Sequence, residues 1–322
     1  MNIAEIKKFL SKLNLKIILG LVLLIGGILL VVQSLFVAKR NSSPPFTVET
    51  KEGKYFSVPT FFPILKYFHY TFSKNGDFWI AHYLDEKKKE SLARIYPPKP
   101  IGTETDDILC RLWEDLARVV SNHAPPNSLF IGWWDISQRL KLFTGQEVWI
   151  ENYDSTVIPQ KVNFLFEEIF GAPLETGKLA ILAKAYNSTA SEGLEMLKQA
   201  LPKNRALFVC VSAEDISNLA LAFGKTPYEM GFEMRIFPLS GSDIHGSIPT
   251  VMKWVNEKQS ASFFLQQLPT QAILAWRADK RAQETLLGRL LPLTSSLKNP
   301  LAGVKLLYQS TWGGYIQIYK IE

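Results

Sequence analysis

The feature that most constrains this chain is an uncharged, almost entirely apolar segment from Ile17 to Ala38, in which Gln33 and Ser34 are the polar exceptions. A bilayer core about 30 Å thick needs roughly 20 apolar residues in a helix, and a helix satisfies its own backbone hydrogen bonds, as lipid requires. A cleaved signal peptide is the alternative, but its apolar core is shorter, about 7–15 residues. The segment therefore predicts a transmembrane helix over residues 17–38 that is retained in the mature protein.

Basic residues flank this segment unequally. Four lysines precede it, whereas only Lys39 and Arg40 follow it closely. The positive-inside rule then leaves the N-terminus in the cytoplasm and sends the rest of the chain across the membrane. We expect a cytoplasmic basic tail at 1–16, a membrane span at 17–38 in contact with lipid, and an exported remainder.

The charge of the exported part limits its partners. The whole chain has a net charge of +6, but residues 1–40 contain six Lys or Arg residues against Glu5 alone, so the remainder is nearly neutral. Binding to nucleic acid needs a clustered cationic face. We therefore expect no nucleic-acid partner. The 47% hydrophobic content is ample for a buried core.

Two sections follow the span. Residues 39–100 predict a linker and a small aromatic-rich β section, with turn signals at Glu52-Gly53 and Asn75-Gly76. Residues 101–322 alternate strand and helix patterns, which indicates βαβ units in a mainly parallel sheet. The final strands pair around Gly313-Gly314 as an antiparallel hairpin. The predicted fold class is α/β, and the strands expected in this second section are 128–134, 148–150, 205–211, 232–237, 262–265, 304–310 and 315–321.

Cys110 and Cys210 are the two cysteines of the chain. Each stands in an apolar context typical of a buried free thiol, although export would permit a disulfide, and the sequence leaves both states open. No Cys-x-x-Cys-His motif for c-type haem occurs, nor any Cys/His cluster with zinc or iron–sulfur spacing. We therefore expect no cofactor.

The first candidate binding site follows the predicted strand at 128–134, which delivers Trp133, Trp134 and Asp135 to its carboxyl end, where ligands bind in open α/β sheets. Arg139, one helical turn later, is spaced to pair with Asp135. The functional interpretation is a polar site walled by indole rings. The structural interpretation is a helix capped by Asp135, with packed tryptophans.

The second candidate, Asp243 with His245, also lies between a predicted strand and a predicted helix. These two side chains suit an acid/base pair or metal ligands, but no third ligand stands at a readable spacing. Asp243 is also an ordinary loop residue, and a lone histidine needs partners for a catalytic role. We therefore predict no metal and no catalytic residue.

Several stretches together resemble the hydroxylamine oxidation protein HaoB family. They are Gly132-Trp-Trp-Asp135 with Arg139 and Thr144-Gly145, Phe237-Pro-Leu-Ser-Gly-Ser-Asp-Ile-His-Gly246, Leu290-Leu-Pro-Leu-Thr294 and the terminal Gly-Gly-Tyr315. The resemblance implies a membrane accessory protein that supports hydroxylamine oxidation in nitrification beside the multihaem hydroxylamine oxidoreductase, in the inner membrane with its soluble domain in the periplasm. It carries over no catalytic residues, so a non-catalytic anchoring or assembly role is expected.

A second resemblance concerns Trp133-Trp-Asp135 and the closing Ile318-Tyr-Lys-Ile321, which are similar to the soluble C-terminal domains of membrane oligosaccharyltransferases and related glycosyltransferases. Those enzymes hold their catalytic carboxylates in a membrane domain with many spans, which a single span cannot supply. This resemblance implies a module that binds a peptide or a glycan at Trp133, Trp134, Asp135 and Arg139.

Overall fold

The computed structural model describes residues 46–54, 59–72, 76–155, 157, 160–174, 176–239, 244–258, 261–268 and 272–322. The chain divides into two compact units, a smaller one of Met1–Val48 with Tyr70–Asp77 and a larger one of Glu49–His69 with Phe78–Glu322. No helix within the described ranges combines the length and apolarity that a bilayer crossing needs. The predicted transmembrane helix, residues 17–38, lies outside those ranges.

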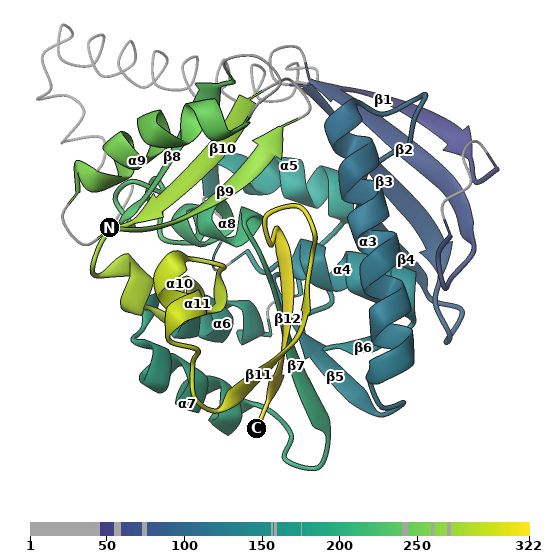
Figure 1. The fold of residues 1–322 in the computed structure, drawn as a ribbon. Coiled ribbons are helices and arrows are strands. Elements are labelled where there is room, and N and C mark those ends of the chain that lie inside the picture. The colour runs from purple at the N-terminus through teal and green to yellow at the C-terminus, as the bar shows by residue number, and fades with distance from the viewer. Residues whose placement is uncertain are drawn as a thin grey trace, which may run out of the picture. The chain divides into compact units, whose positions relative to one another are not determined.

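Four N-terminal strands form one sheet in the order β1-β2-β3-β4, with β3 and β4 antiparallel (Figure 1). Their bounds are β1 Phe46–Glu52, β2 Ile64–Phe72, β3 Gly76–Leu84 and β4 Glu90–Ile95. Aromatic rings pack within each unit. In the smaller unit the Phe46 and Tyr70 rings meet edge to face at 5.3 Å, and in the larger unit Phe62 stacks on Tyr83 at 5.6 Å.

Helix α3, Glu104–His123, begins with a capping box, because the Thr103 side chain accepts from the Asp106 backbone and the Asp106 side chain accepts from the Thr103 backbone. Its buried side carries Leu109, Leu112 and Trp113 among others. The helix packs against α4, Trp134–Thr144.

The central sheet has five strands in the order β11-β12-β7-β5-β6. Their bounds are β5 Ser128–Ile131, β6 Glu147–Val148, β7 Ala206–Ser212, β11 Val304–Gln309 and β12 Ile316–Ile321. Strand β5 runs parallel to both β6 and β7, whereas β12 is antiparallel to β7 and to β11. All four residues of β5 are buried, as expected for a strand covered on both faces.

Helices between these strands build the main core. Helices α6 and α7 pack together, α10 contacts both of them, and α6 also contacts α8, which follows β7. The bounds of the remaining helices are α5 Gln160–Phe170, α6 Lys178–Asn187, α7 Ala190–Ala200, α8 Glu214–Ala222, η2 Ala282–Glu284, α10 Leu286–Leu290 and α11 Thr294–Lys298.

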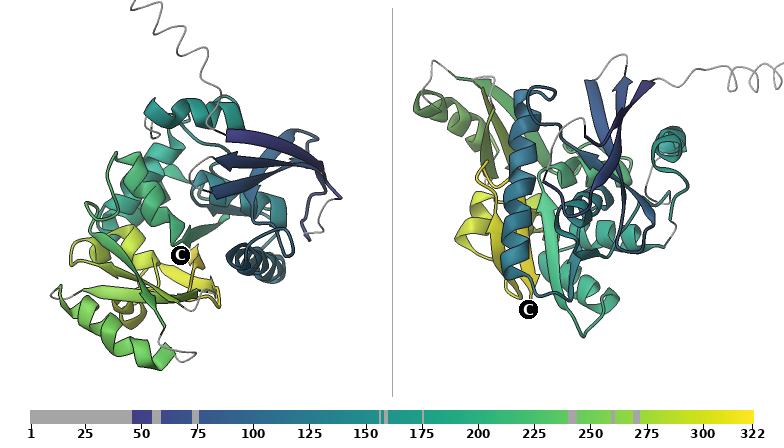
Figure 2. Two further views of the ribbon diagram at one scale, coloured as in Figure 1. Left: turned by 90° about the horizontal axis from the view of Figure 1, so that it is seen from above. Right: turned by 90° about the vertical axis from the view of Figure 1, so that its right-hand side faces the viewer.

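A separate three-stranded sheet has the order β8-β10-β9, and both pairs are antiparallel. Its strands are β8 Phe232–Pro238, β9 Ser262–Leu268 and β10 Ala272–Ala278, and between β8 and β9 the chain forms η1 Ile244–Ser247 and α9 Ile248–Asn256. Both views in Figure 2 show α9 lying against this sheet. Phe237, Trp254 and Ile273 belong to the small apolar cluster between them.

The predicted mainly parallel sheet is wrong. The parallel pairs are β5–β6 and β5–β7, and most other pairs, including every pair of the β8-β10-β9 sheet, are antiparallel. The error comes from strand β10, where the sequence pattern indicated no strand. Once β10 lies between β8 and β9, the helix connection from β8 no longer joins neighbouring parallel strands.

The antiparallel C-terminal hairpin is confirmed. Gly313 and Gly314 both have positive φ, 59° and 69°, in the turn between β11 and β12. A Cβ atom on Gly313 would lie 2.1 Å from the Leu265 carbonyl oxygen, so the turn approaches β9 more closely than any other residue would allow.

Candidate functional site

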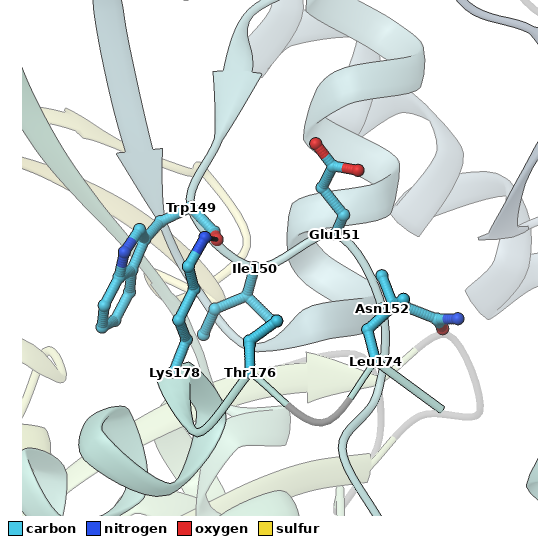
Figure 3. A pocket seen from close by; sticks show the side chains of 7 residues that line it. All are labelled: Trp149, Ile150, Glu151, Asn152, Leu174, Thr176 and Lys178. Carbon is cyan, nitrogen blue, oxygen red and sulfur yellow. Dashed lines mark hydrogen bonds between the residues drawn. The ribbon is translucent and has the colours of Figure 1, made fainter. Parts of the chain in front are cut away.

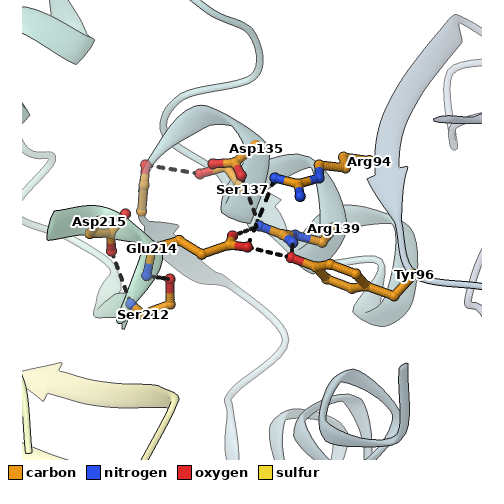
Figure 4. Close-up of polar contacts among 9 residues, drawn as sticks. Arg94, Tyr96, Asp135, Ser137, Arg139, Ser212, Glu214 and Asp215 are labelled. Atoms are coloured by element: carbon orange, nitrogen blue, oxygen red, sulfur yellow. Dashed lines mark hydrogen bonds and ion pairs between the residues drawn. The ribbon is translucent and has the colours of Figure 1, made fainter. Parts of the chain in front are cut away.

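A cluster of charged side chains lies where the parallel strands β5 and β7 end. Since the two strands are neighbours and parallel, their carboxyl ends deliver the following residues to one edge of the sheet. After β5 come Trp133 and Asp135 at the start of α4, and after β7 come Glu214 and Asp215 at the start of α8. Figure 4 shows Asp135 and Glu214 beside Arg139, whereas Asp215 contacts Ser212.

Arg139 ties three segments of the chain together. Its Nη2 donates to Asp135 Oδ2 at 2.8 Å and to Glu214 Oε2 at 3.0 Å. Its Nη1 bonds the Tyr96 hydroxyl, which in turn donates to Glu214 Oε1 at 2.7 Å. The predicted pairing of Arg139 with Asp135 is therefore confirmed, and Glu214 is a second carboxylate partner from a distant part of the sequence.

Aromatic rings enclose the same guanidinium group. The Arg139 Cζ lies 5.0 Å from the centre of the Tyr96 ring and 5.0 Å from the centre of the Trp113 ring, close enough for cation–π attraction. Arg139 is fully buried and Asp135 is 4% exposed. A charge removed from water in this way is stable only when it is paired and hydrogen-bonded.

The cluster reaches the surface through Arg94 and Glu214. Arg94 Nη1 lies 3.8 Å from Glu214 Oε1, and the two side chains are 37% and 22% exposed. Burial would raise the pKa of Glu214, but the nearby guanidinium groups of Arg139 and Arg94 outweigh it and lower that pKa to about 2. Glu214 is therefore ionised at neutral pH.

The other two carboxyl groups shift the opposite way. Burial raises the pKa of Asp135 in spite of Arg139, and burial raises the pKa of Asp215 well above its usual range, with the Asp135 and Glu214 charges adding to the shift. Asp215 Oδ2 accepts from the Ser212 backbone at 2.9 Å, while the Oδ1 atoms of Asp135 and Asp215 have no hydrogen-bond partner among the described residues. A buried oxygen without a donor favours the neutral acid.

The predicted cap at Asp135 is wrong. Helix α4 begins at Trp134, its N-cap residue is Trp133, and no side chain caps it. Asp135 lies one residue inside the helix, so its carboxylate faces Arg139 on the next turn instead of the first backbone N–H groups. The first turn of α4 is thus held by an ion pair and by tertiary packing.

Both tryptophans of the candidate site belong to the core. Trp133 is 2% exposed and Trp134 is 6% exposed. The Trp134 ring packs edge to face against Phe170 at 4.8 Å and Phe166 at 5.8 Å. Neither indole presents a face to solvent, so the predicted wall of indole rings is not open to a ligand in this structure. Ligand binding at Trp133, Trp134, Asp135 and Arg139 stays a prediction.

The second candidate pair cannot be placed. Asp243 lies outside the described residues, and for His245 the structure describes the backbone, in η1, but not the side chain. Across the described ranges, no group of three His, Cys, Asp or Glu side chains could hold a metal ion. A role for Asp243 and His245 also stays a prediction.

A small cavity opens where β6 ends (Figure 3). It has a volume of about 150 Å³, room for a few water molecules at roughly 30 Å³ each. Lys178 Nζ donates to the Trp149 carbonyl at 3.0 Å across its wall. Its lining residues are Trp149, Ile150, Glu151, Asn152, Leu174, Thr176 and Lys178. Ligand pockets are typically about 300–1,000 Å³, so this cavity suits water or a small ion.

Cys110 and Cys210 are both buried free thiols, which resolves the alternative left open by the sequence. Burial raises the pKa of Cys110 to about 12 and also raises that of Cys210. Thiols of such high pKa are poor nucleophiles at neutral pH.

The sequence pattern missed Tyr96, Arg94, Glu214 and Asp215 as members of this cluster. For Glu214 and Asp215 a signal existed, because they follow a buried strand as Asp135 does, at the edge where parallel strands present polar side chains. Tyr96 and Arg94 carried no such signal, since only the folding of β4 against α4 brings them near Arg139.

Two of the solved structures that match this chain do so at low identity. The C-terminal domain of PglB from C. jejuni is 12% identical, with 65% of this chain and 99% of that chain covered and a TM-score of 0.38. The C-terminal globular domain of an oligosaccharyltransferase from Archaeoglobus fulgidus is 10% identical, with 66% and 97% covered and a TM-score of 0.35. These distant likenesses do not favour the alternative of a peptide- or glycan-binding module. No curated protein matches the chain. A family model described as "HaoA-associated protein HaoB" matches residues 12–321.

Proposed function

This chain belongs to the family of HaoA-associated proteins HaoB, and from that membership we propose that it is a non-catalytic accessory protein that supports hydroxylamine oxidation by assembling with the multihaem hydroxylamine oxidoreductase HaoA. The redox chemistry in this proposal belongs to HaoA. The role of the chain is to hold or assemble that enzyme at the membrane.

The observation that carries the proposal is the extent of the family match. Residues 12–321 include the apolar segment 17–38 as well as every described helix and strand. The match therefore spans both the apolar segment and the folded region, and the family takes its description from association with HaoA.

The buried charge cluster fits a supporting role. Arg139 joins α4, the end of β4 and the start of α8, and it is fully enclosed. Such a cluster positions elements relative to one another, and binding of a partner is left to exposed side chains. Large apolar side chains on the described surface include Phe61, Tyr228, Met234, Ile236 and Leu297.

The proposed location is the inner membrane, with residues 17–38 embedded in lipid, the N-terminus in the cytoplasm and residues 39–322 in the periplasm. The support is the uncharged composition of residues 17–38 and the excess of lysine before them. A protease added to spheroplasts should then digest the chain, and a carbonate wash should leave it in the membrane pellet.

A single charge should weaken this attachment. Ile28→Lys places an ammonium group near the middle of the segment, where it costs about 2.5–3.5 kcal/mol, so a larger share of the chain should be released by carbonate. Asn41→Lys, just outside the segment, is the matched control and should stay in the pellet. Release of the unmodified chain by carbonate would contradict the proposed location.

The assembly itself is tested by co-purification. The full-length chain with an N-terminal tag is solubilised from membranes in mild detergent and captured, and haem staining should then detect HaoA in the eluate. A tagged single-span protein of unrelated sequence controls for haem proteins that adhere to any membrane protein. Recovery of folded chain without HaoA, in several detergents and at low salt, would contradict the proposal.

A further inference from the structure

Strand β8 is an edge strand with an exposed apolar pair. It pairs with β10 along one side, and no further backbone hydrogen bond to 233–237 is found within the described ranges. Met234 is 50% exposed and Ile236 is 56% exposed. Native proteins usually protect edge strands with charge, proline or a covering element, since unpaired N–H and C=O groups recruit further strands.

The two faces of β8 differ. Phe237 and Arg235 lie on the face that α9 covers, where the Arg235 guanidinium sits 5.2 Å from the Phe237 ring. Met234 and Ile236, two residues apart, share the opposite face, because side chains of a strand alternate. That opposite face is buried at Phe232 and exposed at Met234 and Ile236.

The charges of β8 leave two groups available on the α9 face. Glu233 uses Oε2 for Arg277 Nη2 at 2.8 Å and for Lys258 Nζ at 3.0 Å, whereas no contact of its Oε1 is found among the described residues. Arg235 is exposed, and it has no ion-pair partner among the residues that the structure describes. Glu233 Oε1 and the Arg235 guanidinium, two residues apart on one strand, therefore have no ion-pair partner among the described residues.

We propose that β8 pairs with β8 of a second copy of this chain, antiparallel and about a two-fold axis at Met234, so that two three-stranded sheets become one six-stranded sheet. In this register Glu233 of each copy stands opposite Arg235 of the other, and Met234 stands opposite Met234. The backbone N–H of Phe232 is bonded to the Pro227 carbonyl at 2.9 Å, so the paired segment runs from 233 to 235. Opposite charges and apolar pairs directly across two strands are the favourable cross-strand combinations. The register repeats itself because an isologous interface uses one patch on both subunits.

The self-complementarity selects a second copy over other occupants. The sequence from Phe232 to Ile236 alternates apolar residues with an acid and a base, so reversal about Met234 converts each charge into its opposite. A shift of the axis to Arg235 would place Arg235 opposite itself, which is unfavourable. The inference stands apart from the proposed association with HaoA and does not depend on it.

Disulfide trapping tests the register. Residues opposite each other in an antiparallel pair have Cα atoms about 4.5–5.5 Å apart, within the range that a disulfide spans. Met234→Cys in the full-length chain, in detergent and with a mild oxidant, should therefore yield a reducible dimer on a gel. Cys110 and Cys210 are buried and should not contribute. Leu306→Cys is the matched control, because Leu306 is 43% exposed on β11, the edge strand of the central sheet, and it should give at least ten-fold less dimer.

Charge reversal tests the pairing without a crosslink. Arg235→Glu faces Glu233 of the partner and should raise the concentration at which the dimer dissociates at least ten-fold in sedimentation experiments, while Arg235→Lys should leave it nearly unchanged. Circular dichroism checks that both variants are folded. A monomer at all concentrations, equal crosslinking at Met234→Cys and Leu306→Cys, or crosslinking of Met234→Cys to HaoA alone would each overturn the proposal.

Discussion

Two buried arginines of this chain, Arg139 and Arg277, are both paired with carboxylates, but the solvent exposure of those carboxylates differs. Arg139 in α4 is fully enclosed, and its carboxylate partners Asp135 and Glu214 are 6% and 22% exposed. Arg277 in β10 is 6% exposed, but its partners Glu233 and Glu257 are 26% and 55% exposed. Each guanidinium lies beside a tryptophan ring, at 5.0 Å from Trp113 for Arg139 and 4.2 Å from Trp254 for Arg277.

The difference lies in what remains when the arginine is removed. Around Arg277 the carboxylates retain water and Lys258, and accordingly the pKa of Glu233 is lowered by Arg277 and Lys258 in spite of some burial. Around Arg139, Asp135 would be left without a counter-charge in a dry site, and burial already raises its pKa. Solvent access, more than the number of ion pairs, therefore decides how much each arginine stabilises the fold.

The largest effect is expected for Arg139→Met. Breaking a buried ion pair by removal of one partner costs about 3–5 kcal/mol, so the free energy of unfolding in urea should fall by that amount. Asp135→Asn in the same chain should restore part of the loss, because it removes the unpaired charge. A loss below about 1 kcal/mol would show that the buried ion pairs of Arg139 contribute little to stability.

A smaller loss is expected for Arg277→Met. Hydrogen bonds to charged groups contribute about 1.5–3 kcal/mol, and Glu233 keeps its contact with Lys258. Arg111→Met is the control, because Arg111 is 64% exposed on α3 in a surface pair with Asp107, and it should change the unfolding free energy by no more than about 0.5 kcal/mol. If Arg277→Met cost as much as Arg139→Met, solvent access would not explain the difference between the two sites.

The pH dependence of unfolding separates the neighbours Glu214 and Asp215. Glu214 has a lowered pKa of about 2 in the fold, so its contribution is present above the pKa of the unfolded chain and is lost as pH falls toward 2. Asp215 has a raised pKa, so its contribution is present in acid and is lost as pH rises through the folded pKa. Glu214→Gln should flatten the stability profile between about pH 2 and 5, and Asp215→Asn should flatten it above about pH 4. A profile unchanged by Asp215→Asn would mean that this carboxyl is ionised in the fold.

The smallest loss of stability is expected for the helix cap at Thr103, which depends only on contacts within the first turn of α3. Thr103→Ala removes the side chain that accepts from Asp106 at the start of α3, and loss of such a cap costs about 1 kcal/mol. Thr103→Ser keeps the acceptor oxygen and should cost less. Calorimetry on both variants, beside Arg139→Met, shows how far a tertiary ion pair exceeds a cap.

Features that depend on close spacing in the sequence were predictable. The Thr103–Asp106 capping box and the Asp135–Arg139 pair each join residues within one helical turn, and the hairpin at Gly313-Gly314 follows from its turn residues. Strand β10 was not predictable, because Ala272, Ile273, Leu274 and Ala275 form an unbroken apolar run without the alternation of a half-buried strand. Such a run looks the same in a buried strand and in a buried helix, and β10 is the central strand of its sheet.

By itself the sequence determined the α/β class, the uncharged segment at 17–38 and the resemblance to the HaoB family, since each rests on composition or on residues near one another in the chain. The tertiary structure alone decided that the sheets are mostly antiparallel and that Trp133 and Trp134 are both buried. It also decided that Glu214, 75 positions away in the sequence, forms an ion pair with Arg139. The physical reason is that burial and ion pairing depend on which distant segments share an interior. Only the assembled fold fixes that arrangement, because it removes water from some charges and leaves it around others.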